Sequence, residues 1–78
     1  MREVKIYLGT IERVKDFVNA VTRLDCDVDI VSGRYVIDAK SIMGIFSVDM
    51  SKAVELRIHA EGTEAEKAME VISPFIEK

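Results

Sequence analysis

The sequence has few of the residues that build covalent or metal-based scaffolds. Its 78 residues include one Cys, one His, one Pro and no Trp. The single cysteine, Cys26, excludes an internal disulfide framework and a multi-cysteine metal site. The single histidine, His59, excludes a multi-histidine zinc site within one chain. We therefore expect neither a metal nor a cofactor in this protein.

Charge and hydropathy argue against two further classes of partner. Eleven basic and fourteen acidic residues leave a net charge of −3, so no positive excess is available to neutralise nucleic-acid phosphates. No apolar run approaches the roughly 18 residues of a membrane span, and no apolar signal-peptide core opens the chain. Because 49% of the side chains are hydrophobic, we expect one folded domain over residues 1–78, located in the cytoplasm.

Four stretches alternate apolar and polar side chains, as half-buried strands do. They cover residues 3–8, 26–31, 34–39 and 54–60. The pair Ser32-Gly33 lies between the second and third stretches and predicts a hairpin turn there. Every strand has one polar face, which favours an antiparallel sheet with one face in water.

Helical spacing of apolar side chains predicts two helices before the last strand. The first covers about 11–23, with Thr10 as its N-cap. The second is short, about 42–48, with Ser41 as its N-cap. The stripe expected to bury the first helix consists of Ile11, Val14, Phe17, Val18, Val21 and Leu24.

A last helix follows the fourth strand. Thr63 and Glu66 form a Thr-x-x-Glu capping box, and the apolar stripe extends to Ile76, with Pro74 near its C-terminal end. The order βαββαβα predicts an α+β open-faced sandwich, in which helices cover one face of a four-stranded antiparallel sheet. A ferredoxin-like βαββαβ domain is the alternative that the pattern alone leaves open.

Most candidate chemical groups have a simpler structural interpretation. Asp25, Asp27 and Asp29 recur at every second residue, which is typical of a solvated strand face as well as of a weak cation site. His59 falls on a predicted polar face without a nucleophile to serve. Cys26 is out of phase with the three acids, so we expect it to face the core as a small hydrophobe.

Two sites place a hydroxyl at the start of a predicted helix, where free amides favour an anion. They are Gly9-Thr10 and Lys40-Ser41. A phosphate on Ser41 would add about −1.5 to −2 of charge there. Plain N-capping is the competing interpretation at both sites.

The segment Lys40-Ser41-Ile42-Met43-Gly44-Ile45-Phe46-Ser47 resembles the HPr family, the histidine-containing phosphocarrier proteins of the bacterial sugar phosphotransferase system, and their Crh-like relatives. The flanks agree without gaps, from Asp27-Val28-Asp29-Ile30 to the strand Glu55-Leu56-Arg57-Ile58-His59-Ala60-Glu61-Gly62. The resemblance covers nearly the whole chain and implies an HPr-like fold.

Departures from the family pattern concern the phosphocarrier segment. The family carries phosphate on a His in Gly-(Ile/Leu)-His-x-Arg-Pro, and counting back from Ser41 places that His at Thr10, the Arg at Glu12 and the Pro at Arg13. Threonine cannot form a phosphoimidazole, and His59 lies on another element. The resemblance therefore implies a protein without phosphocarrier activity and without a catalytic residue.

Ser41 matches the family's regulatory serine, which HPr kinase/phosphorylase modifies. Crh-like relatives lack the His, keep this serine and act with the transcription regulator CcpA. The resemblance thus implies a regulatory role in catabolite repression. Lysines 15, 40 and 52 are candidates to help bind a phosphate. The partner-binding residues we expect are Thr10, Lys15, Ile42, Met43 and Phe46.

Two acidic residues favour an alternative. Glu12 and Asp49 would repel a phosphate on Ser41. A degenerate HPr-fold interaction module that is never phosphorylated is therefore the second hypothesis. An enzyme, such as a small acid–base catalyst, is the third and weakest hypothesis, because no set of acid, base and nucleophile converges in the pattern.

Overall fold

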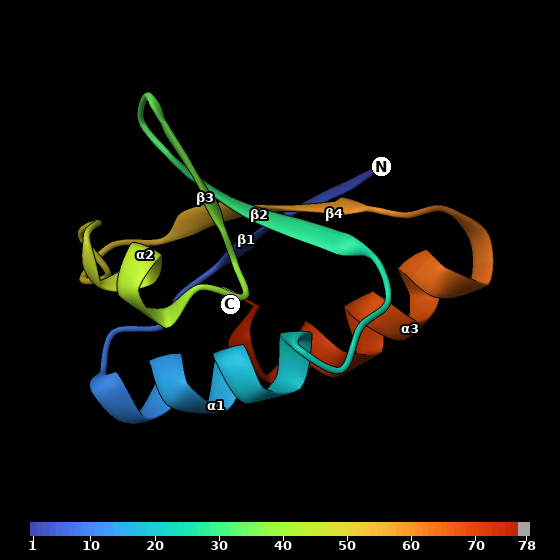
Figure 1. Cartoon of the computed structure of the whole chain (residues 1–78), viewed down its shortest axis with the longest axis horizontal. Coiled ribbons are helices and arrows are strands. Elements are labelled where there is room, and N and C mark those ends of the chain that lie inside the picture. The colour runs from blue at the N-terminus through green and yellow to red at the C-terminus, as the bar shows by residue number, and fades with distance from the viewer. Residues whose placement is uncertain (77–78) are drawn as a thin grey trace.

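The architecture is an open-faced α+β sandwich (Figure 1). The computed structural model describes residues 1–76. Its elements in chain order are β1 (Arg2–Ile6), α1 (Ile11–Val21), β2 (Asp27–Ser32), β3 (Tyr35–Asp38), α2 (Ile42–Phe46), β4 (Val54–His59), α3 (Gly62–Ile72) and the 3-10 helix η1 (Ser73–Phe75).

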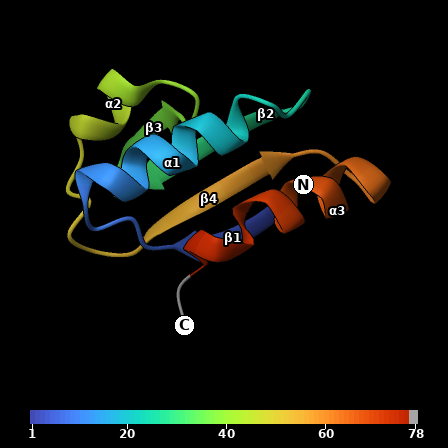
Figure 2. The same ribbon diagram turned by 90° about the horizontal axis from the view of Figure 1, so that it is seen from below.

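The four strands form one antiparallel sheet in the order β1-β4-β2-β3. Helices α1 and α3 run side by side over one face of it, and α2 lies at one end, beside β3 (Figure 2). The other face, which we call the open face, is left to solvent. This arrangement confirms the predicted fold class, and the ferredoxin-like alternative is wrong for this chain.

The core lies between the sheet and the helices. Strands β2 and β4 contribute Val28, Ile30, Leu56 and Ile58, all essentially inaccessible to solvent. Helix α1 contributes Val14, Phe17 and Val21. These residues were expected in the core from their spacing, and Cys26 also faces it as predicted.

Ile11 departs from the predicted stripe. Its side chain is 63% exposed, although it lies three residues before the buried Val14. Ile11 has the helical spacing of a buried residue. It is exposed because it is the first residue of α1, where the helix begins. The predicted helix also continued to residue 23, whereas α1 ends at Val21 and Thr22 is its C-cap.

Both ends of α3 differ from the prediction. Glu61, not Thr63, is the N-cap, and it makes no side-chain capping bond. Gly62, at a φ of 63°, turns the chain into the helix directly after β4, so Thr63 already lies in the first turn. At the other end, α3 stops at Ile72 because Pro74 cannot continue an α-helix.

The residues after α3 return to the sheet. Ile76 was expected on the last helix, but it forms an isolated antiparallel bridge with Ile6. The backbone N–H of Tyr7 donates to the carbonyl oxygen of Phe75 at 2.9 Å. The ring of Phe75 packs edge-on against Phe17, with the ring centroids 5.4 Å apart. The C-terminal segment therefore ties β1 to α1.

Arg13 reinforces this junction. One of its Nη atoms donates to the carbonyl oxygen of Tyr7 at 2.9 Å and to that of Pro74 at 3.3 Å. Its guanidinium carbon lies 5.3 Å from the centroid of the Phe75 ring. A planar guanidinium can stack on a ring and donate in its plane at the same time. Arg13 therefore joins the segment after β1 to α1 and η1.

We expect Arg13→Lys to lower the free energy of unfolding by about 1–3 kcal/mol, because an ammonium cannot reproduce both carbonyl contacts and the ring contact. Urea denaturation followed by circular dichroism measures this change. Arg23→Lys is the matched control, since Arg23 is an exposed arginine just after the same helix. Equal denaturation midpoints for the two variants would contradict the role given to Arg13.

Candidate functional site

The start of α1 is built by a tight turn after β1. Gly9 adopts a φ of 73°, and a Cβ there would approach the Tyr7 ring to 2.7 Å. The Gly9 N–H donates to the carbonyl oxygen of Met50 at 3.1 Å, which fixes the turn to the chain before β4. The hydroxyl oxygen of Thr10 then accepts from the N–H of Arg13 at 3.1 Å. Thr10 is thus the N-cap, as predicted.

Ser41 occupies the corresponding position in α2. Its hydroxyl oxygen accepts from the N–H of Gly44 at 3.2 Å, and the residue is half-buried. Gly44 is required by packing, because a Cβ there would lie 2.6 Å from Ile37. Lys40, expected to help bind a phosphate on Ser41, instead donates from Nζ to the carbonyl oxygen of Leu24 at 2.9 Å.

An apolar hollow lies between the start of α1 and the C-terminal end of α2. We call this region the α1–α2 surface. It places Thr10 and Ile11 of α1 beside Phe46 of α2, and it is lined by Gly9, Thr10, Ile11, Val14, Phe46, Val48 and Met50. Ile11, Met43 and Phe46 are among the most exposed large hydrophobic side chains of the described residues, at 63%, 76% and 46%.

The expected partner-binding residues therefore differ in accessibility. Met43 and Phe46 are three residues apart on α2 and share one side of it. Ile42 is half-buried and packs against the core. Lys15 is exposed on α1 and does not line the hollow. The sequence analysis assigned Ile11 to the core. Its position in the first turn of α1 was the one signal that could have indicated exposure.

Acidic side chains flank this surface. Glu12 is exposed in the first turn of α1. Asp49 accepts hydrogen bonds through one carboxylate oxygen from the hydroxyl of Ser51 at 2.5 Å and from its N–H at 2.9 Å. These bonds, with a smaller contribution from the charge of Lys52, hold the pKa of Asp49 below its ordinary value. The carboxylate is therefore charged throughout the physiological range.

The three acids of the Asp25–Asp29 pattern do not share one site. Asp27 and Asp29 line a hollow on the open face together with Asp38 and His59. His59 Nε2 lies 2.7 Å from a carboxylate oxygen of Asp29. This contact joins residues 30 positions apart, which sequence reasoning missed because it depends on the register of β2 with β4. Within residues 1–76 no group of His, Cys, Asp and Glu side chains has a metal-binding arrangement.

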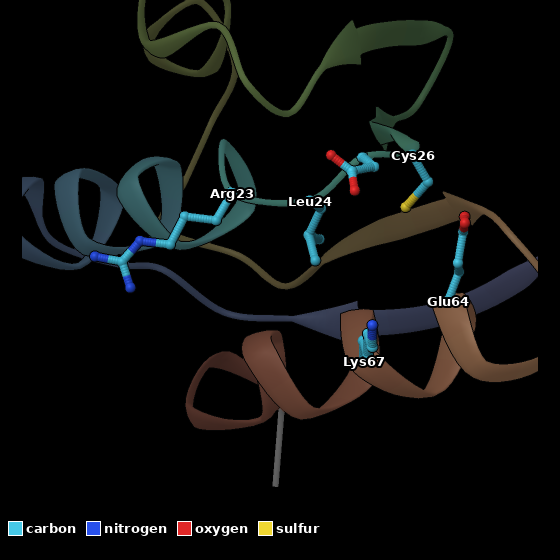
Figure 3. Close-up of a pocket in the computed structure, with 6 residues that line it drawn as sticks. Arg23, Leu24, Cys26, Glu64 and Lys67 are labelled. Atoms are coloured by element: carbon cyan, nitrogen blue, oxygen red, sulfur yellow. The ribbon is translucent and has the colours of Figure 1, made fainter.

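Asp25 instead borders a second hollow, where α1 leads into β2. Figure 3 shows Cys26 facing this hollow from the sheet side and Glu64 from α3. Arg23 and Lys67 complete the charged lining. Two acidic and two basic side chains balance one another there, so no net positive charge is present to activate the thiol. We assign this hollow no function.

Comparison with known proteins agrees with the fold. The family model described as PTS HPr component phosphorylation site matches residues 12–78. The chain is 32% identical over 77 residues to the HPr-like protein Crh of Halalkalibacterium halodurans, covering 97% of this chain and 92% of the relative. It is 29% identical over 62 residues to the HPr-like protein Crh of Bacillus subtilis, covering 80% and 73% respectively.

Solved structures give the same result. The phosphocarrier protein HPr of Bacillus anthracis superposes with a TM-score of 0.72 at 26% identity, covering 97% of this chain and 94% of that one. HPr-C-His from Thermoanaerobacter tengcongensis shares the fold with a TM-score of 0.77 at 23% identity, covering 96% and 91%. The class is thus a small open-faced α+β sandwich with two capped helix starts at one end. The chain belongs to the HPr family.

No helix among residues 1–76 combines the length and the apolar character needed to cross a membrane.

We expect Ser51→Ala to raise the pKa of Asp49 toward its ordinary value, because the Ser51 hydroxyl makes the largest contribution to lowering it. An NMR titration of the Asp49 carboxyl carbon measures the shift. The stability that this carboxylate contributes is present at neutral pH and is lost as the pH falls through its folded-state pKa. Lys52→Ala is expected to raise the pKa less, since its charge contributes least. An unchanged pKa in Ser51→Ala would contradict the assignment.

Proposed function

We propose that this protein is a non-enzymatic regulatory member of the HPr family that carries no phosphate on histidine and is modified at Ser41. The observation that supports it most is the pair of capped helix starts. One holds Thr10, which caps α1 with its hydroxyl, and the other holds Ser41, which caps α2. A hydroxyl in place of an imidazole at the start of α1 argues against phosphate relay, since a threonine phosphate is a stable ester.

His59 is poorly placed to substitute for a histidine at the start of α1. It lies at the end of β4, and its ring contacts Asp29 on the open face. Thr10 lies at the start of α1, which is on the opposite side of the sheet (Figure 1). This separation of His59 from the start of α1 supports a protein without phosphocarrier activity.

The environment of Ser41 suits a regulatory modification. The hydroxyl is half-buried and held by one bond, from the N–H of Gly44. A phosphate there would stand on the same short helix as the exposed Met43 and Phe46, and would change the charge of the α1–α2 surface. We propose HPr kinase/phosphorylase as the modifying enzyme and a CcpA-like regulator as the partner, with the cytoplasm as the place of action.

A second function is favoured by the charges beside this surface. Glu12 and the ionised Asp49 add negative charge where a phosphoserine would need positive charge. Lys40 is engaged with the Leu24 carbonyl. The alternative is therefore a module that binds its partner through Ile11, Met43 and Phe46 without modification of Ser41. Exposed apolar clusters of this kind mark protein-binding sites.

We expect incubation with ATP and an HPr kinase from a Gram-positive bacterium to add one phosphate to Ser41, because this serine caps an accessible short helix that matches the family's regulatory segment. Intact-mass spectrometry and peptide mapping measure the product. Ser41→Ala is the negative control, and Ser47→Ala, which alters the hydroxyl at the other end of α2, is the matched control. Absence of phosphate on folded protein would favour the unmodified module.

The variant Glu12→Arg tests whether the negative charge at residue 12 slows the phosphorylation of Ser41. If acidic repulsion limits modification, this variant should be phosphorylated at least about threefold faster, since it replaces a repelling carboxylate by an attracting guanidinium. A rate equal to that of the original protein would show that Glu12 does not oppose the phosphate.

We expect no phosphate transfer from Enzyme I and its phosphoryl donor, because the start of α1 offers a threonine hydroxyl instead of an imidazole. Intact mass before and after incubation measures the result, with a histidine-containing HPr as the positive control. An acid-labile phosphate mapped to His59 would overturn the proposal.

A further inference from the structure

Strand β3 is an edge of the sheet and carries exposed apolar side chains. It pairs with β2 on one side, and no strand among residues 1–76 pairs with its outer side. Tyr35 and Val36 are 64% and 60% exposed. The strand belongs to a hairpin that projects beyond the helices (Figure 1). An open edge of this kind is a template for another strand.

The backbone groups on this edge can be identified from the ladder. The Ala39 N–H donates to the Val28 carbonyl oxygen at 2.9 Å, which makes that pair a hydrogen-bonded one. Because the two kinds of pair alternate, Val31 and Val36 form a non-hydrogen-bonded pair. The N–H and the carbonyl oxygen of Val36 therefore point away from β2, toward the open edge.

Arg34 and Asp38, which carry opposite charges, flank Val36, each two positions away along the chain. Arg34 is in the hairpin turn, and its side chain has no hydrogen bond or ion pair within the described residues. Asp38 faces Asp29 directly across the ladder, an unfavourable like-charge pair, and its carboxylate accepts only from the Lys40 N–H, at 2.9 Å, in this part of the chain. Among residues 1–76, Asp38 thus has no cationic side chain as an ion-pair partner, and Arg34 has no anionic one.

We propose that β3 pairs antiparallel with β3 of a second copy of this chain, centred on Val36. In that register Val36 faces the partner's Val36, and Arg34 of each copy lies beside Asp38 of the other. The outward backbone groups of Val36 then bond to each other across the two-fold axis. A register centred on Ile37 would set Arg34 beside Lys40, so charge selects the register centred on Val36.

This interface borders the site of the proposed function, because the Ser41 N–H donates to the carbonyl oxygen of Asp38 at 3.0 Å. The residues that carry it are Arg34, Val36 and Asp38, none of which lines the hollow of the α1–α2 surface. Both faces of the protein stay accessible in the pair, because the second copy extends the sheet sideways. The two proposals are tested by different measurements, self-association here and phosphate incorporation at Ser41, so the failure of one does not decide the other.

Sedimentation equilibrium at low salt, with protein up to millimolar concentration, tests the proposal. We expect a reversible dimer that weakens as salt is added. Arg34→Glu should weaken it about tenfold or more, because each of two attractive pairs becomes repulsive. Arg2→Glu on the opposite edge strand makes the same change of net charge and should leave the dissociation constant nearly unchanged.

A charge swap makes the test specific to contact between copies. Arg34→Glu combined with Asp38→Arg should restore most of the affinity, since the two positions are too far apart along one strand to contact each other within a copy. Concentration-dependent protection of the Val36 amide in hydrogen exchange should accompany the dimer. A protein that is monomeric at millimolar concentration overturns the proposal. A dimer whose dissociation constant is unchanged by Arg34→Glu also overturns it. So does a double variant that does not regain affinity.

Discussion

The pairing of β2 with β4 is the constraint on which the rest of this structure depends. It sets Val28 opposite Ile58 and Ile30 opposite Leu56, so the four innermost apolar side chains of the sheet face α1 and α3 together. A shift of either strand by one residue would turn that strand's apolar side chains to solvent. The same register sends the intervening residues to the open face. There Arg57 contacts Glu3 and Glu55, and His59 contacts Asp29.

This division of the sheet separates two kinds of surface. The open face is polar, and its single imidazole is held by a carboxylate from the neighbouring strand. The α1–α2 surface combines the capped start of α1 with exposed apolar side chains at the end of α2 and has no imidazole.

Local geometry at the start of α1 depends on distant segments. The turn at Gly9 is held by Met50, and Arg13 reaches the carbonyl oxygens of Tyr7 and Pro74. The start of α1 is thus positioned by the segment before β4 and by the C-terminal segment as well as by its own capping residue. A partner that binds there would meet a surface fixed by three parts of the chain.

Particular residues show where sequence reasoning held and where it did not. The caps at Thr10 and Ser41, the burial of Phe17 and Cys26, and the hairpin at Gly33 all depend on neighbours within a few positions, and all were predicted. Thr63 satisfied a capping-box pattern, but Gly62 started the helix too early for that box to form. Ile11 fitted a helical stripe that the tertiary structure does not cover at its first turn.

The sequence by itself determined the order of strands and helices, the chain's polar and apolar faces, and the hydroxyl caps at Thr10 and Ser41. These features follow from short-range periodicity, capping and residue chemistry. Only the tertiary structure decided the strand order β1-β4-β2-β3, the contact of His59 with Asp29 and the junction made by Arg13. Each of these joins residues far apart in the chain, and their partners are set by which apolar faces pack together.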